Sequence, residues 1–357
     1  NTAGNVLVAD GTNFNSIAVG DLSAISTVAA GLNVPIPTCP VESILNLVAI
    51  LPVSFVLKSI GDPEVCCELA LQPIRRFDLD ASILFSDILT IPDAFNLGVE
   101  FKEGEGPVFK KPIKDIKAIK NLPSFNPSDL SYVYKCVKNI RGALPASIPL
   151  IGFCGSPWTL AAYSLEGSSS KDFAFTRSFI SENSIQTQEL LKKYTDACFE
   201  YLKEQVIAGI DAIQIFDSWA NLLNKQEYES FSLKYINDLV QQLKADDITK
   251  NIPIIIFARQ PQGGIKQLTN CKPECISLFW DESIDSSIKL LKNKTAIQGS
   301  LNPMILKEDN SIIYKEVKTM VEKFKNYPGY IFNLGHGITP DINPDKVKFL
   351  TDSIREL

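Results

Sequence analysis

Four polar residues stand where side chains could perform proton transfer or bind an anion, each close behind a run of apolar residues. The only histidine in 357 residues, His336, lies between two glycines in NLGHG. Asp87 stands in FSDIL, Tyr163 follows CGSPWTL, and Ser218 stands in FDSW. A histidine can move a proton near neutral pH, and a carboxylate can accept several hydrogen bonds or stabilise a developing positive charge. These four residues are therefore candidates for one site.

Each candidate also has an ordinary structural interpretation. Asp87 could cap the helix that follows it, Ser218 could serve a turn, and Tyr163 could belong to an amphipathic core. His336 could donate to a nearby carbonyl group, although its flanking glycines indicate a backbone that bends tightly or that another group approaches closely. The residues taken one at a time leave these alternatives open.

Seven short apolar runs, separated by helix-like sequence, must position these residues. The runs are almost continuously apolar, which is typical of parallel strands covered on both faces. They span residues 81–85, 148–153, 212–216, 252–257, 275–280, 295–299 and 329–334. Between them, residues 185–207 repeat apolar side chains at helical spacing, and Gly209 is a plausible C-cap.

This alternation predicts a single-domain (β/α)8 TIM barrel rather than a doubly wound sheet, because no Gly-x-Gly-x-x-Gly turn opens any helix. The βα loops of such a barrel meet at one rim, so the four candidates should lie together. The first strand region is atypical: an eighth strand is expected before Asp80, at residues 34–39 or 48–57. We therefore divide the chain into an N-terminal segment, residues 1–60, either poorly ordered or carrying the first strand, and a barrel domain, residues 61–357.

The composition argues against several classes of function. The net charge of −6 argues against a nucleic-acid-binding surface. We expect no membrane span, because no stretch reaches about 18 uninterrupted apolar residues. Eight cysteines without regular spacing predict a reducing compartment. The first forty residues hold no arginine, so we assign no targeting signal and expect the cytoplasm, with a plastid left open.

The chain resembles the uroporphyrinogen decarboxylase family over about residues 62–357. The matching segments are DPEVCCELALQPIRRF, FSDIL, IGFCGSPWTLAAY, QVIAG, QGSLNP and NLGHG, in this order. The resemblance implies a homodimeric (β/α)8 barrel that converts uroporphyrinogen to coproporphyrinogen in haem biosynthesis by removing carbon dioxide from four acetate side chains. It implies no metal and no organic cofactor. It places the family's site aspartate, tyrosine, serine and histidine on Asp87, Tyr163, Ser218 and His336.

The chemistry of this implied reaction suits those residue types. An ionised Asp87 could accept the pyrrole N–H groups and stabilise the cationic ring that forms on protonation. Tyr163 could orient Asp87 or a substrate carboxylate, Ser218 could bind a carboxylate, and His336 could donate to one or relay a proton. The apolar Phe85 and Phe216, with Phe153, are expected to form a dry wall around them.

The sequence departs from the family at the N-terminus. The family's arginine-bearing segment has no counterpart in residues 37–58, and the first arginine is Arg75. Substrate carboxylates would then be desolvated without guanidinium partners, which predicts impaired binding and turnover. Three explanations stay open: a different reading of the gene's start, a catalytically inactive porphyrinogen-binding paralogue, or an arginine elsewhere, such as Arg259. A zinc-dependent methyltransferase of the same fold is a weaker alternative, because no cysteine follows Cys275.

Overall fold

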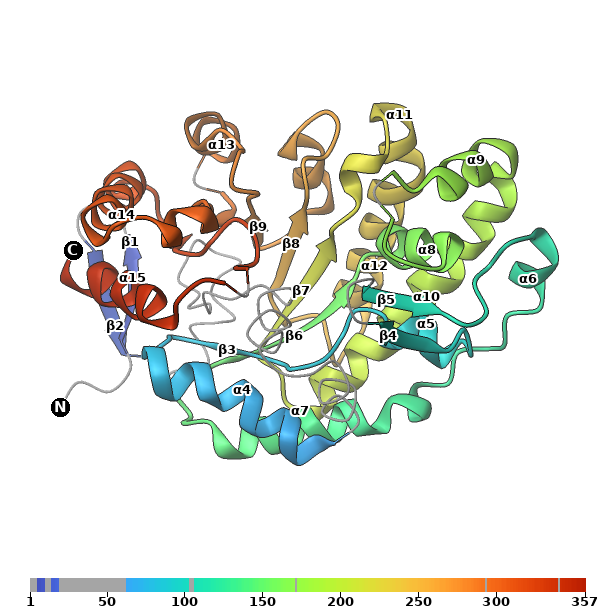
Figure 1. The fold of residues 1–357 in the computed structure, drawn as a ribbon, viewed down its shortest axis with the longest axis horizontal. Helices are drawn as coiled ribbons and strands as arrows, with labels where there is room; N and C mark the ends of the chain where they lie inside the picture. The colour runs from blue at the N-terminus through green and yellow to red at the C-terminus, as the bar shows by residue number, and fades with distance from the viewer. Residues whose placement is uncertain are drawn as a thin grey trace.

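One curled parallel β-sheet surrounded by helices forms the centre of the molecule (Figure 1). The computed structural model describes residues 5–9, 14–18, 62–102, 106–170, 172–292, 294–339 and 341–357. Within these ranges no helix is long and apolar enough to cross a lipid bilayer.

Seven strands build this sheet, and their order in space follows their order in the chain. They are β3 (Ser82–Ile83), β6 (Leu150–Gly155), β7 (Ala212–Asp217), β8 (Ile254–Ala258), β9 (Cys275–Ser277), β10 (Ala296–Gln298) and β11 (Tyr330–Ile331). All neighbouring pairs are parallel, and β3 and β11 are the two edges of the described sheet. Each of the seven apolar runs overlaps one of these strands, which confirms the predicted strands and the α/β class.

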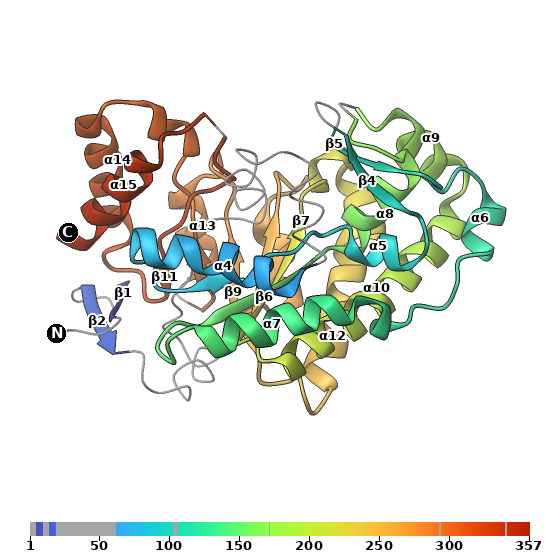
Figure 2. The same cartoon turned by 60° about the horizontal axis from the view of Figure 1, so that its bottom comes forward.

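Helices connect the strands and cover the outer face of the sheet (Figures 1 and 2). The longer ones are α4 (Pro63–Phe77), α7 (Ser131–Ala143), α8 (Pro157–Glu166), α9 (Ala174–Glu182), α10 (Ser184–Ala208), α12 (Lys234–Ala245), α13 (Ile284–Leu291), α14 (Asn310–Phe324) and α15 (Pro344–Glu356). The short ones are α5 (Thr90–Ala94), α6 (Ile116–Lys120), α11 (Lys225–Glu227), η2 (Pro127–Leu130), η3 (Ala220–Leu222), η4 (Tyr228–Leu233), η5 (Ile265–Cys271) and η6 (Pro303–Lys307).

Helix α10 shows how the sequence pattern produces an element. Leu190, Leu191 and Tyr194 are buried on one face, because residues three and four apart share one face of a helix, whereas Ile185 and Ile207 near its two ends are exposed. The helix ends at Gly209, whose φ of 116° lies in the left-handed region and whose N–H donates to the carbonyl of Gln205. The predicted helix and its C-cap glycine are confirmed.

Two antiparallel hairpins lie outside the parallel sheet. One joins β1 (Asn5–Ala9) to β2 (Phe14–Ala18), and the other joins β4 (Val99–Lys102) to β5 (Gly106–Phe109). Apart from the first hairpin, the N-terminal segment, residues 1–60, lies outside the described residues. The same holds for both segments proposed for the eighth strand, 34–39 and 48–57.

The parallel strands are buried on both faces, and this fixes where their side chains point. Every residue of β6 and β7 is buried. Because successive side chains of a strand point to opposite faces, Ile213 and Ile215 share one face of β7 while Gln214 and Phe216 share the other. The next residues, Asp217 and Ser218, continue this alternation beyond the strand.

Candidate active site

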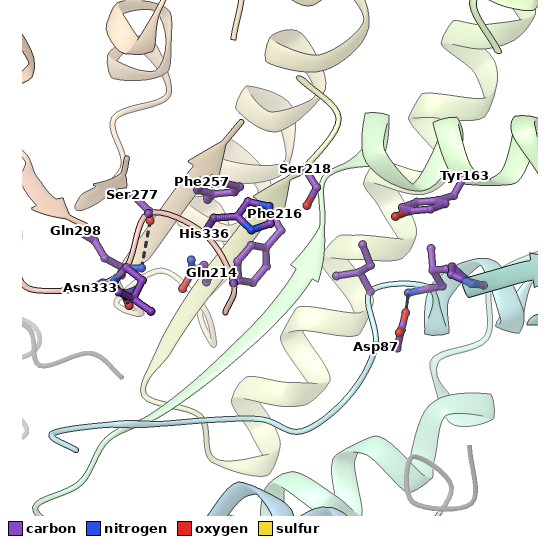
Figure 3. A pocket seen from close by; sticks show the side chains of 16 residues that line it. Asp87, Tyr163, Gln214, Phe216, Ser218, Phe257, Ser277, Gln298, Asn333 and His336 are labelled. Atoms are coloured by element: carbon purple, nitrogen blue, oxygen red, sulfur yellow. Dashed lines mark hydrogen bonds between the residues drawn. The ribbon is translucent and has the colours of Figure 1, made fainter. Parts of the chain in front are cut away.

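A pocket at the carboxyl ends of the strands holds the predicted polar residues (Figure 3). Asp87, Tyr163, Ser218, His336 and Phe216 all line it. The four polar side chains come from the connections that follow β3, β6, β7 and β11. The pocket contains about 760 Å³ of free space, its open mouth included. Five of the six predicted site residues thus share one cavity.

The sixth predicted residue, Phe85, does not line this pocket. Its side chain is 2% exposed and belongs to the apolar core, where its carbonyl accepts a weak hydrogen bond from the Cys136 thiol. Strand β3 ends at Ile83, so the chain leaves the strand before Phe85 and does not carry the ring to the pocket wall. Phe153 is also fully buried, with its ring centroid 5.8 Å from that of Phe216.

Asp87 is a buried carboxylate at the start of a helical turn. Its Oδ1 accepts the N–H of Leu89 at 2.7 Å, just before α5. Burial raises the pKa of Asp87 from 3.8 to about 6, and the Leu89 hydrogen bond partly opposes that rise. In Figure 3 the carboxylate is turned toward this hydrogen bond, on the same side of the pocket as Tyr163. Asp87 therefore accepts a backbone hydrogen bond in the turn before α5 and also lines the pocket.

Tyr163 and Ser218 present hydroxyl groups to the same pocket. In Figure 3 both hydroxyls point into the space between their elements. The Tyr163 ring packs edge-on against Phe173 and Trp219, with centroid separations of 5.9 and 5.7 Å. Trp219 directly follows Ser218, so the residue that supports the tyrosine ring is attached to the serine.

His336 is held by an aromatic contact and a crowded backbone. Its ring meets that of Phe279 edge-on, with 5.6 Å between centroids. A Cβ atom at the preceding Gly335 would overlap the backbone of Trp280, so only glycine fits there. The expectation that another group approaches this backbone closely is confirmed.

A buried carboxylate network ties the loop of Ser218 to the helix of Tyr163. The fully buried Asp217 accepts hydrogen bonds through Oδ1 from Ser156 at 2.7 Å and from Thr159 at 3.1 Å, and through Oδ2 from Ser232 at 2.6 Å. Thr159 also accepts the backbone N–H of Trp219 at 3.3 Å. Burial raises the pKa of Asp217, and the three hydroxyls oppose that rise. The network fixes both connections relative to each other.

Sequence reasoning missed a group of neutral polar side chains that also lines the pocket. They are Gln214, Ser277, Gln298 and Asn333, all buried. The Gln298 amide donates to Ser277 Oγ at 3.1 Å, while its Oε1 is buried without a hydrogen-bond partner. The available signal was the position of Gln214, Ser277 and Gln298 inside otherwise apolar strands. A polar side chain in a strand that is covered on both faces needs a polar environment, such as a pocket, because burial without a hydrogen bond is costly.

Comparisons with known proteins identify the family of this chain. The profile of the family described as "Uroporphyrinogen decarboxylase (URO-D)" matches residues 49–357. The chain belongs to the uroporphyrinogen decarboxylase family. A relative named uroporphyrinogen decarboxylase from Ruthia magnifica subsp. Calyptogena magnifica is 44% identical over 295 residues, which cover 82% of this chain and 85% of that protein. One from Legionella pneumophila (strain Corby) is 43% identical over 298 residues, 83% of this chain and 84% of that protein.

Solved structures outside the uroporphyrinogen decarboxylases share the fold. A methyltransferase from Methanosarcina mazei superposes with a TM-score of 0.74 at 19% identity, covering 95% of this chain and 99% of its own. A B12-independent methionine synthase from Shewanella sp. W3-18-1 gives a TM-score of 0.53 at 13% identity, covering 85% and 88%. At these identities the likeness shows the fold alone. The described residues contain no group of three or more His, Cys, Asp or Glu side chains that could hold a metal ion.

Proposed function

We propose that this chain is a carboxy-lyase that removes carbon dioxide from the four acetate side chains of uroporphyrinogen and gives coproporphyrinogen. The observation that carries the proposal is the meeting of Asp87, Tyr163, Ser218 and His336 in one pocket of a chain of this family. At each acetate a pyrrole carbon is protonated, the bond to the carboxylate breaks, and its electron pair moves into the cationic ring. A second protonation at the exocyclic carbon and loss of the ring proton complete the methyl group, so one proton replaces each carbon dioxide.

Asp87 supplies the charge that this reaction needs. With a pKa of about 6, its carboxylate is mostly ionised at neutral pH although it is buried. An ionised carboxylate has about four lone-pair sites, so the oxygen sites not used by Leu89 can accept pyrrole N–H groups. A negative charge in a dry site stabilises the positive charge that develops on the ring.

The other residues of the pocket orient the substrate. Tyr163 and Ser218 donate hydrogen bonds to substrate carboxylates, and His336 donates to a carboxylate or relays a proton near neutral pH. Phe216 and Phe257 supply apolar lining that excludes water beside them. In this arrangement Phe85 supports the core behind the site.

Three further properties belong to the same proposal. The sheet closes into a (β/α)8 barrel, because its strand order follows the chain and β3 and β11 are the two edges of the described sheet. The active protein is a homodimer, which light scattering of the purified protein measures. The chain works in the cytoplasm, because eight cysteines without regular spacing are typical of a reducing compartment.

Anaerobic turnover tests the proposed function. Purified protein is incubated with uroporphyrinogen under anaerobic conditions, and the products are oxidised and separated by chromatography. Coproporphyrin supports the proposal. Porphyrin binding without any decarboxylated product would instead favour an inactive binding paralogue. A chimera carrying an arginine-bearing family N-terminus separates the causes of weak turnover: restored activity assigns the defect to the first sixty residues, whereas equal inactivity assigns it to the barrel.

A further inference from the structure

The pocket has a charge deficit if it binds the proposed substrate. Uroporphyrinogen carries eight carboxylates, yet none of the described residues that line the pocket is a lysine or an arginine. The pocket instead contains the buried Asp87, which is itself negative near neutral pH. Bringing a carboxylate into such a site without a cationic partner is strongly unfavourable, because the desolvated charge stays unpaired. A cation just beyond the lining residues would remove part of that cost.

Arg259 is placed to supply this cation. It directly follows β8, at the end of the sheet where the pocket opens. Phe257, two residues earlier, lines the pocket, and residues two apart on a strand point to the same face. The Arg259 N–H continues the β8–β7 ladder by donating to the Asp217 carbonyl at 3.1 Å, so the strand alternation extends to Arg259.

The guanidinium of Arg259 and the ring of His336 both contact Phe279. The Arg259 Cζ atom lies 5.4 Å from the centre of the Phe279 ring, and this ring in turn packs against His336. The stacked arrangement holds the planar guanidinium without using its N–H groups. The Arg259 Nε atom is buried and has no hydrogen-bond partner. A buried donor left unsatisfied is unfavourable, and an incoming carboxylate would supply its missing hydrogen bond.

Most other arginines are already engaged. Arg75 pairs with Glu68, Arg141 with Asp211 and Arg355 with Asp80, and Arg76 lies over the ring of Phe77. Arg177 is exposed on α9 and does not line the pocket. Among the arginines, all of which lie in the described ranges, Arg259 alone combines a place beside the pocket with a buried, unsatisfied donor.

We propose that Arg259 is a substrate-binding residue whose guanidinium binds a carboxylate side chain of the porphyrinogen next to His336. This inference rests on the proposed function, because it needs an anionic substrate in this pocket. A guanidinium suits the task, since its rigid fork of N–H groups can match both oxygens of a carboxylate. Phe279 is then a positioning residue that keeps the fork oriented while the pocket is empty.

The test compares Arg259→Gln and Arg259→Lys with Arg177→Gln, an exposed arginine that loses the same charge. Anaerobic kcat and KM for uroporphyrinogen are measured at low and high KCl. We expect Arg259→Gln to raise KM about tenfold at low salt, equivalent to about 1.4 kcal/mol, and the ratio to shrink at high salt. Arg259→Lys should keep part of the affinity, because it restores the charge but not the fork. Arg177→Gln should match the wild type.

A folded Arg259→Gln protein with a KM within twofold of wild type at low salt would overturn the inference while leaving the proposed function intact. If the wild type does not turn over, the dissociation constant for coproporphyrin, measured by fluorescence, replaces KM with the same expectations. A wild type that binds no porphyrin would defeat both proposals. If Arg259→Gln does not fold, Arg259→Lys and Phe279→Leu carry the test, and wild-type affinity in both would overturn the inference.

Discussion

The hydrogen bonds around Asp217 lead to a prediction that distinguishes an effect on turnover from an effect on folding stability. Thr159→Val keeps the side-chain shape but removes two hydrogen bonds: the one to Asp217 Oδ1 at 3.1 Å and the one accepted from Trp219 N–H at 3.3 Å. A bond to a charged acceptor contributes about 1.5–3 kcal/mol, and an unpaired buried N–H costs about 1–3 kcal/mol. After relaxation we expect unfolding free energy to fall by about 2–4 kcal/mol.

The functional effect follows from the position of Trp219. This residue joins Ser218 to the network and packs against the Tyr163 ring, so a loosened backbone displaces two pocket side chains at once. Because displacements near 1 Å can cost about a hundredfold in rate, we expect kcat/KM to fall about tenfold or more.

Ser232→Ala is the matched control. It removes the bond to Asp217 Oδ2 at 2.6 Å from η4, on the opposite side of the carboxylate, and leaves Trp219 bonded to Thr159. We expect a loss of stability of about 1.5–3 kcal/mol with nearly wild-type kcat/KM. Denaturant unfolding and anaerobic turnover are measured on both variants. Equal losses of kcat/KM in the two, or wild-type kcat/KM in Thr159→Val, would refute the reasoning.

Three further outcomes follow from the site. Because burial raises the pKa of Asp87 from 3.8 to about 6, its contribution to stability is fully present below 3.8 and is lost as the pH rises through 6. Asp87→Asn should therefore gain about 2.4 kcal/mol over wild type between pH 4 and pH 7 in denaturant unfolding, and a constant difference would contradict the shifted pKa. The kcat/KM of the wild type should fall as the pH drops below about 6, because protonation of Asp87 removes the negative charge that stabilises the cationic ring. A value of kcat/KM that stays constant down to about pH 5 would count against an ionised Asp87. Gly335→Ala should lower the free energy of unfolding by about 1–3 kcal/mol, because the added methyl group overlaps the Trp280 backbone. Gly142→Ala has open space around it and should leave the free energy of unfolding unchanged or raise it. Equal stabilities of the two variants in denaturant unfolding would contradict a rigid contact at Gly335.

The strands were predictable because a parallel strand buried on both faces must be apolar almost throughout. All seven runs of this kind overlap strands, and polar residues that follow four of them line one pocket. The start of the chain gave no comparable signal, since the segments 34–39 and 48–57 lack a clear strand pattern.

The interactions around the site were less predictable, because they join residues far apart in the sequence. Asp217 meets Ser156 across 61 positions, and only the register of β6 beside β7 brings them together. The inward direction of Gln214 and Gln298 depends in the same way on which face of each strand meets the pocket. Phe85 failed as a wall residue because strand β3 ends earlier than its apolar run suggested.

The turnover of Asp87→Asn bears on the proposed mechanism more strongly than any other single value. Asparagine keeps an oxygen that can accept the Leu89 N–H, so the turn before α5 should persist while the negative charge is lost. If the buried carboxylate stabilises the cationic ring, anaerobic kcat/KM at pH 7 should fall by about a hundredfold or more in a fully folded protein. A folded Asp87→Asn enzyme that makes coproporphyrinogen at the wild-type rate would contradict that role.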